Sequence, residues 1–216
     1  MSDPAKIHRY TGAAATIGWD AGRCIHAAEC VRRVPASFDP KAKPWILPDA
    51  AEAQALADAV NQCPSGALSM TYADGTSAMA TPQDDTAHVT AGGPYHFRGK
   101  LTLRVGESEL RDTRVALCRC GASANKPFCD NSHRKIGFAD PGALPVDVAA
   151  PPEVDPSAPL TITAKPDGPL QCAGPLTLVG ANGRRRFAET TFLCRCGGSA
   201  NKPYCDGTHK RNGFTS

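Results

Sequence analysis

The sequence has few of the residues that build one large hydrophobic core. Only 6% of its 216 residues are aromatic, whereas it contains 20 glycines and 19 prolines. No apolar run approaches the roughly 20 residues that cross a bilayer, and the first residues lack the charged and apolar regions of a signal peptide. We therefore expect a cytoplasmic protein without a membrane partner, built from small modules that bound metal helps to stabilise.

Charge and missing motifs exclude further classes of function. A formal net charge of +3 is too small to favour nucleic acid as a partner. The sequence contains no glycine-rich dinucleotide fingerprint, phosphate-binding loop or nucleophile motif. These absences favour a protein that is not an enzyme.

Cysteine is the residue that organises this sequence. Ten cysteines in a reducing compartment indicate metal ligands rather than disulfides. Two segments, offset by 76 residues, share the order Cys-x-Cys, eight residues, Cys, three residues, His. The candidate ligands are Cys118, Cys120, Cys129 and His133 in the first segment and Cys194, Cys196, Cys205 and His209 in the second.

Three thiolates and one imidazole provide two terminal ligands for each iron of a [2Fe–2S] cluster. The close pair Cys118 and Cys120 would hold one iron, and Cys129 with His133 the other. The same donors also suit zinc, although zinc fingers usually place two residues between paired cysteines instead of one. A neutral imidazole in place of a thiolate would raise the reduction potential of a cluster.

Both segments resemble the CDGSH iron–sulfur domain. The second segment matches the family motif at every position from Cys194 to His209, and the first departs once, with Asn131 in place of glycine. Asparagine tolerates left-handed backbone geometry, so we expect this loop to persist. The resemblance implies two [2Fe–2S] clusters, in a monomer whose two repeats mimic the homodimer of the family.

A second, weaker cysteine pattern lies in the N-terminal part. Cys24 and Cys30 precede a remote Cys-Pro pair that begins at Cys63, and bacterial ferredoxins also combine closely spaced cysteines with a remote Cys-Pro. The middle cysteine of the ferredoxin pattern is replaced here by Ala27. Residues 10–72 resemble the divergent single-cluster ferredoxin domain that accompanies CDGSH repeats in bacteria.

The type of the N-terminal cluster stays open at this point. Three cysteines suit a [3Fe–4S] cluster, whereas a [4Fe–4S] cluster requires a fourth ligand, for which His26 is the nearby candidate. His26 could equally serve in packing, and the domain could also lack a cluster. We expect a helix over residues 25–33 and a second one over 49–62, the latter capped by Asp49.

The predicted fold is α+β. We expect an N-terminal ferredoxin-like β-α-α-β domain over residues 1–80, followed by two small β-rich CDGSH modules packed as a pseudo-two-fold pair. The modules span residues 87–138 and 160–216, and a proline-rich linker over 139–159 joins them.

The predicted function is electron transfer, iron–sulfur cluster transfer or sensing, with a redox partner or apo-acceptor protein of unknown identity. The alternative is an iron–sulfur subunit or domain of a reductase.

Two further groups of residues have predicted places. Cys172 aligns with Phe97 of the first repeat, which indicates a buried packing position. Arg119 and Arg195 lie between the paired cysteines, where each could either raise the potential of a cluster or be solvated.

Overall fold

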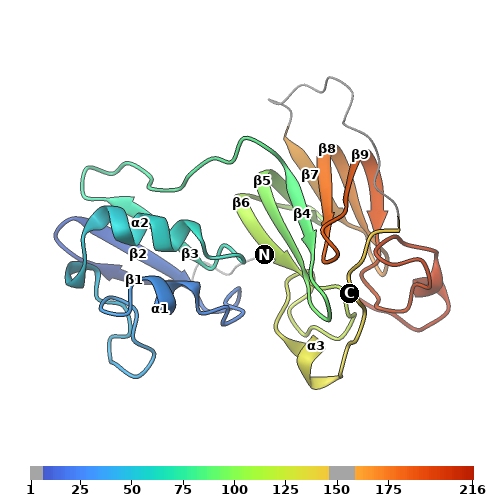
Figure 1. The fold of residues 1–216 in the computed structure, drawn as a ribbon, viewed down its shortest axis with the longest axis horizontal. Coiled ribbons are helices and arrows are strands. Elements are labelled where there is room, and N and C mark those ends of the chain that lie inside the picture. Colours follow the sequence, from blue (N-terminus) through green and yellow to red (C-terminus); the bar gives the residue numbers. More distant parts are fainter. Residues whose placement is uncertain (1–6, 146–158) are drawn as a thin grey trace. The chain divides into compact units, whose positions relative to one another are not determined.

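The computed structural model describes residues 7–145 and 159–216, which form two compact units divided between Ala80 and Thr81 (Figure 1). Both are mixed α and β, and the repeat unit is mostly strand. Among the described residues, no helix has the length and apolarity needed to span a membrane. We call the two parts the N-terminal unit and the repeat unit.

The N-terminal unit is an antiparallel sheet with its helices inserted before the last strand. The sheet has the order β1 (Ile7–Thr11), β2 (Ala15–Asp20), β3 (Leu68–Tyr72). Between β2 and β3 the chain forms α1 (Glu29–Arg33), η2 (Pro48–Ala50) and α2 (Ala53–Asn61). Leu56 and Val60 of α2 pack with Ile17, Phe38 and Met70 in one buried core.

Three details of this unit differ from the prediction. Strand β1 precedes the expected elements, so the order is β-β-α-α-β. Helix α1 begins only at Glu29, because Ala28 before it has a left-handed backbone with φ of 61°. The second helix does not start at Asp49, whose carboxylate instead accepts a hydrogen bond from the Ala13 N–H at 2.7 Å.

The repeat unit is built from two matching hairpins. Its elements are β4 (Thr86–Val89), β5 (Tyr95–Val105), β6 (Ser108–Leu117), α3 (Ser132–Lys135), β7 (Leu160–Ala164), β8 (Leu170–Gly180), β9 (Arg185–Leu193) and η3 (Thr208–Lys210). Hairpins β5–β6 and β8–β9 each carry an irregularity at the same place, after Arg98 and after Ala173.

The two repeats share one sheet. The short strand β4 pairs antiparallel with β5 and parallel with β8, whereas β7 pairs parallel with β5 and antiparallel with β8. Each short strand therefore bridges the long strands of both repeats. Leu103 and Phe97 of the first repeat pack with Ile162 and Leu178 of the second in a common core.

The first part of the predicted linker belongs to this fold. Leu144 is 1% exposed and joins the shared core, and its carbonyl accepts a hydrogen bond from Asn182 at 3.0 Å. Residues 139–145 of the predicted linker therefore pack on the repeat unit through the buried side chain of Leu144. Residues 146–158, the rest of that linker, lie outside the described residues.

Candidate metal centres

Each hairpin ends directly in a ligand loop. Cys118 follows the last residue of β6, and Cys194 follows the last residue of β9. Each loop folds back on its strand, since the N–H of Cys118 donates to Pro127 and that of Cys194 donates to Pro203, both at 2.8 Å. The strands therefore fix the position of the first ligand in each repeat.

The ligand atoms of each repeat come in two close pairs. The sulfurs of the Cys-x-Cys cysteines are 3.8 Å apart in both repeats. The third cysteine sulfur is 3.4 Å from Nδ1 of the histidine in both repeats. Two thiolates bound to one tetrahedral metal ion at about 2.3 Å lie about 3.8 Å apart. Each pair thus has the spacing to share one ion, which fits the two irons of a [2Fe–2S] cluster.

The aspartate after the third cysteine ties the two sides of each loop together. Asp130 accepts hydrogen bonds from the N–H groups of Ala124 at 2.8 Å and Ser132 at 2.9 Å. Asp206 does the same in the second repeat, where the Thr208 hydroxyl and backbone N–H groups hold the pKa of this carboxyl far below its usual range. The short helical turn that follows, α3, begins at Ser132.

Asn131 adopts the left-handed conformation that its family position requires. Its φ is 69°, close to the 84° of Gly207 at the matching position. The N–H groups of these two residues point at the sulfurs of Cys129 and Cys205 at 3.4 Å. The expectation that the loop tolerates asparagine is confirmed, and both loops present an N–H donor to a sulfur that would carry negative charge.

The thiols of the first site differ in acidity. The interaction with Cys120, together with backbone N–H groups, lowers the pKa of Cys118 to about 6, although burial opposes this change. Burial raises the pKa of Cys129 to about 11 and lowers that of His133. Burial therefore favours the protonated thiol at Cys129, and a bound metal ion would replace that proton.

The two ligand loops touch each other. Cys120 and Cys196 form an isolated antiparallel backbone bridge. The next residue in each loop is a glycine with positive φ, 82° at Gly121 and 74° at Gly197. A Cβ atom there would lie 2.6 Å and 2.5 Å from the carbonyl oxygen of the opposite cysteine. Only glycine permits this approach.

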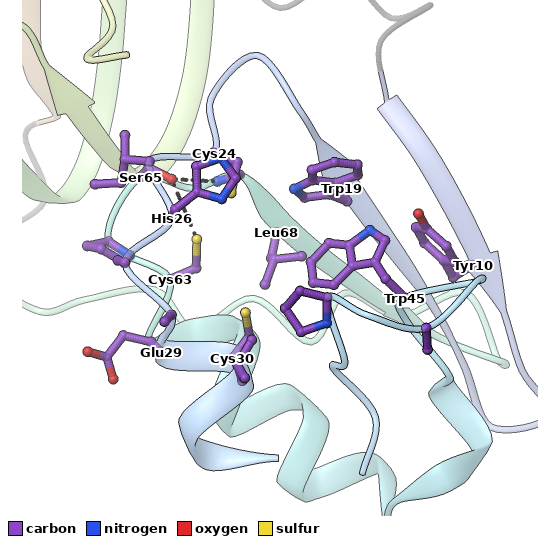
Figure 2. Close-up of a pocket in the computed structure, with 18 of the residues that line it drawn as sticks. Tyr10, Trp19, Cys24, His26, Glu29, Cys30, Trp45, Cys63, Ser65 and Leu68 are labelled. Atoms are coloured by element: carbon purple, nitrogen blue, oxygen red, sulfur yellow. Dashed lines mark hydrogen bonds between the residues drawn. The ribbon is translucent and has the colours of Figure 1, made fainter. Parts of the chain in front are cut away.

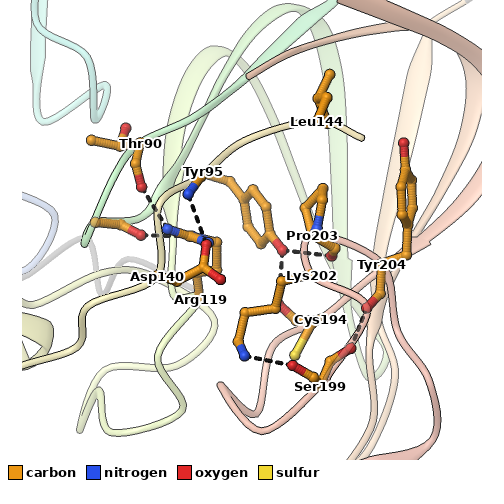
Figure 3. Close-up of polar contacts among 12 residues, drawn as sticks. Thr90, Tyr95, Arg119, Asp140, Leu144, Cys194, Ser199, Lys202, Pro203 and Tyr204 are labelled. Carbon is orange, nitrogen blue, oxygen red and sulfur yellow. Dashed lines mark hydrogen bonds and ion pairs between the residues drawn. The ribbon is translucent and has the colours of Figure 1, made fainter. Parts of the chain in front are cut away.

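Tyr95 links the first repeat to the ligand loop of the second. Its side chain is fully buried, and its hydroxyl lies 3.0 Å from the Cys194 carbonyl oxygen and 2.9 Å from that of Pro203 (Figure 3). Leu170 occupies the equivalent place in the second repeat, so the link has no counterpart. Tyr95 is not among the predicted site residues, although the presence of Tyr in one repeat and Leu in the other, between otherwise similar strands, is a signal.

The arginines between the paired cysteines are buried, which shows that the solvated interpretation is wrong for both. Arg119 is 1% exposed and Arg195 is 3% exposed. Arg119 forms an ion pair with Asp140 and hydrogen bonds with the carbonyl groups of Gly93 and Thr90 (Figure 3). Cys172 is also buried, as predicted, and burial raises its pKa strongly.

The N-terminal candidates line one cavity of about 600 Å³. Cys24 and His26 come from the loop before α1, Cys30 from its first turn, and Cys63 from the end of α2 (Figure 2). Burial, with a smaller contribution from the neighbouring Cys63 and Cys24 side chains, raises the pKa of Cys30 to about 11. The structure therefore brings together the three predicted cysteines, with His26 on the same wall.

The cavity differs from expectation in its helix, and its opposite wall adds a feature that the sequence did not predict. Only Cys30 lies in a helix, because the chain from Cys24 to Ala28 is a loop with left-handed residues at His26 and Ala28. The opposite wall is aromatic, with Trp19 and Trp45 in edge-to-face contact at 4.9 Å between ring centroids (Figure 2). Three thiols at one end of such a cavity fit an iron–sulfur cluster.

Comparison with known proteins agrees with the division into an N-terminal unit and a repeat unit. Residues 10–73 match the family model of the divergent 4Fe-4S mono-cluster domain, and residues 92–134 and 167–210 match that of the iron-binding zinc finger of CDGSH type. The uncharacterized protein YjdI of Escherichia coli K12 is 37% identical over 59 residues, which cover 27% of this chain and 78% of the relative. The same values hold for YjdI of Escherichia coli O157:H7.

No solved structure matches the chain. The family models nevertheless cover both the N-terminal cavity and the two ligand loops. The chain therefore belongs to the iron–sulfur proteins in which a divergent 4Fe-4S mono-cluster domain precedes two CDGSH-type iron-binding domains.

Proposed function

We propose that this protein is a non-catalytic iron–sulfur protein. It transfers electrons, transfers iron–sulfur clusters or acts as a sensor. Each repeat holds one [2Fe–2S] cluster, and the N-terminal unit holds a [3Fe–4S] cluster, or a [4Fe–4S] cluster if His26 completes its ligands. The observation that carries this proposal is the identical pairing of donors in both repeats, at 3.8 Å and 3.4 Å.

The histidine ligand supports a redox role. A neutral imidazole in place of a thiolate makes the cluster less negative, so the cluster accepts an electron more readily. Both repeats keep this ligand at the same distance from the third cysteine, although other parts of the two repeats differ. A redox partner or an apo-acceptor protein in the cytoplasm would receive the electron or the cluster.

We also propose a monomer in which the repeats are related by an approximate two-fold axis. The exchange of short strands supports this arrangement, because β4 and β7 each pair with the long strands of both repeats. Two subunits of a symmetric dimer would make the same reciprocal contacts. Sedimentation of the holoprotein should then give a mass near the 22.6 kDa of one chain.

Iron, sulfide and visible absorption of anaerobically purified protein test the proposal. The clusters assumed here require about 7 or 8 irons per chain, about four of them in the repeats. A coloured protein with this content supports the proposal. A colourless protein with zinc in the repeats would overturn it.

One observation favours a second candidate function, that of an iron–sulfur domain in a reductase. The cavity of about 600 Å³ beside Cys24, Cys30 and Cys63 is as large as a small-molecule site. The two functions differ in whether this cavity is filled by a cluster in the holoprotein or is free to bind a small molecule. If a cluster fills the cavity, the fluorescence of Trp19 and Trp45 should not respond to small aromatic probes, whereas saturable quenching would favour a substrate site.

A further inference from the structure

The two buried arginines, Arg119 and Arg195, have matching hydrogen-bond partners on the backbone. Nε of Arg119 donates to the carbonyl of Gly93, and Nε of Arg195 donates to that of Gly168, both at 2.9 Å. Their Nη2 atoms donate to the carbonyls of Thr90 and Lys165, both at 2.5 Å. Backbone carbonyls therefore fix both side chains in the same way.

The third partner of each arginine is different. Arg119 pairs with the carboxylate of Asp140, whereas Nη2 of Arg195 contacts the hydroxyl of Ser216 at 2.6 Å. Asp140 and Ser216 are 76 residues apart, which is the offset of the two ligand motifs. Among the described residues, no carboxylate lies within 4.0 Å of Arg195, and Asp167 acts on its charge from farther away. One guanidinium is thus neutralised by an ion pair and the other is not.

Both charges are close enough to affect the ligand sets. Arg119 and Arg195 each lie between two ligands in the sequence, and their loops meet at the bridge between Cys120 and Cys196. The Arg119 charge acts on His133, and that of Arg195 acts on Cys118. Buried charges are weakly screened, so a single carboxylate changes the local potential over several ångströms.

We propose that the difference between Asp140 in the first repeat and Ser216 at the matching position of the second gives the two repeat clusters unequal reduction potentials. The pair of clusters then accepts two electrons one at a time. This inference rests on the proposed function, in which both repeats hold [2Fe–2S] clusters. In each step, one electron from a one-electron reductant converts one ferric iron of one cluster to ferrous iron, without a change in bonding. The positioning residues are Asp140 and Ser216, which act through the arginines.

Variants that make the two repeats equal at this position test the inference. The parent is the full chain. Ser216→Asp places a carboxylate beside both arginines, and Asp140→Ser removes it from both. Anaerobic titration with dithionite, followed by electron paramagnetic resonance, measures the separation between the two reduction steps of the repeats.

The parent should show two separate one-electron steps, and both symmetric variants should bring the steps together. A tenfold change in the ratio of the two reduced clusters corresponds to about 59 mV for a one-electron couple. The double variant Asp140→Ser/Ser216→Asp should separate the steps again with the order of the clusters reversed. His133→Cys, introduced into the parent in a separate experiment, identifies the first cluster because the added thiolate changes the signal and lowers the potential of that cluster alone.

An unchanged separation in both symmetric variants, at full cluster content, would overturn the inference, as would an equal shift of both steps. Absence of [2Fe–2S] signals from the parent would instead contradict the proposed function. If Asp140→Ser does not fold, Asp140→Asn removes the charge and keeps an acceptor. Ser216→Asp provides an independent test, because Ser216 is exposed and tolerates a larger side chain.

Discussion

Replacing Tyr95 by phenylalanine should weaken the second metal centre more than the first. The hydroxyl that is lost lies within 3.0 Å of the carbonyl oxygens of Cys194 and Pro203. Pro203 keeps a second partner, the Cys194 N–H at 2.8 Å, whereas the Cys194 carbonyl loses this side-chain donor. Burial raises the pKa of Tyr95, so the native hydroxyl keeps its proton and remains a donor.

The expected cost follows from this geometry. Removing one partner of a buried hydrogen bond costs about 1–3 kcal/mol, because the remaining carbonyl is left unsatisfied. We take about 2 kcal/mol, which would lower the melting temperature of the repeat unit by roughly 8 °C. If the loss is confined to the loop that begins at Cys194, the open form of that loop becomes roughly 30-fold more populated. The second cluster should then be lost faster than the first.

Tyr204→Phe provides a matched control. It removes the same hydroxyl from a tyrosine whose oxygen is buried without a hydrogen-bond partner in the described part of the chain. Thermal unfolding of the anaerobic holoprotein, followed by circular dichroism, and loss of visible absorbance in the presence of a chelator measure both effects. If Tyr95→Phe and Tyr204→Phe behave alike, the Tyr95 hydroxyl does not support the loop and our reasoning is wrong.

Four further predictions test other parts of the molecule. His209→Cys should lower the potential of the second cluster, because a thiolate adds negative charge, and redox titration would expose an error if the potential stays the same. Cys63→Ser should remove about 3 or 4 irons and leave the repeat spectrum intact; iron analysis that finds the same content would disprove an N-terminal cluster. Gly197→Ala places a Cβ atom 2.5 Å from the opposite carbonyl, so it should speed cluster loss from both repeats. Gly183→Ala, at a φ of 77° with open space around it, should not affect the clusters. Cys172, which is 1% exposed, should resist iodoacetamide until the protein unfolds, and rapid labelling of the native protein would refute its burial.

The ligand sets could be predicted from the sequence because their spacing is local. The Cys-x-Cys pairs and the histidines lie within 16 residues in each repeat, and the loop that joins them is short. Strand β7 also has a local signal, because apolar and polar residues alternate from Leu160 to Ala164. Asn131 could be accepted in place of glycine because left-handed geometry depends mainly on the residue itself.

Features that depend on distant partners could not be predicted in this way. Arg119 is a charged residue between two candidate ligands, and its burial depends on Asp140, which composition placed in a linker. The helix expected from residue 25 fails because Ala27 and Ala28, good helix formers, lie in a loop that positions Cys24 and Cys30 around a cavity. Helix propensity is a weak preference that such tertiary demands override.

The bridge between Cys120 and Cys196 has a consequence for how the protein is made. The two residues are 76 positions apart, so the first ligand loop leaves the ribosome long before the strand and loop that complete it. Strand β5 likewise waits for β7, and β4 for β8, since both partners come later in the chain. A nascent chain that ends before residue 196 therefore offers an unfinished site, and an interrupted translation product should not retain iron in its first repeat.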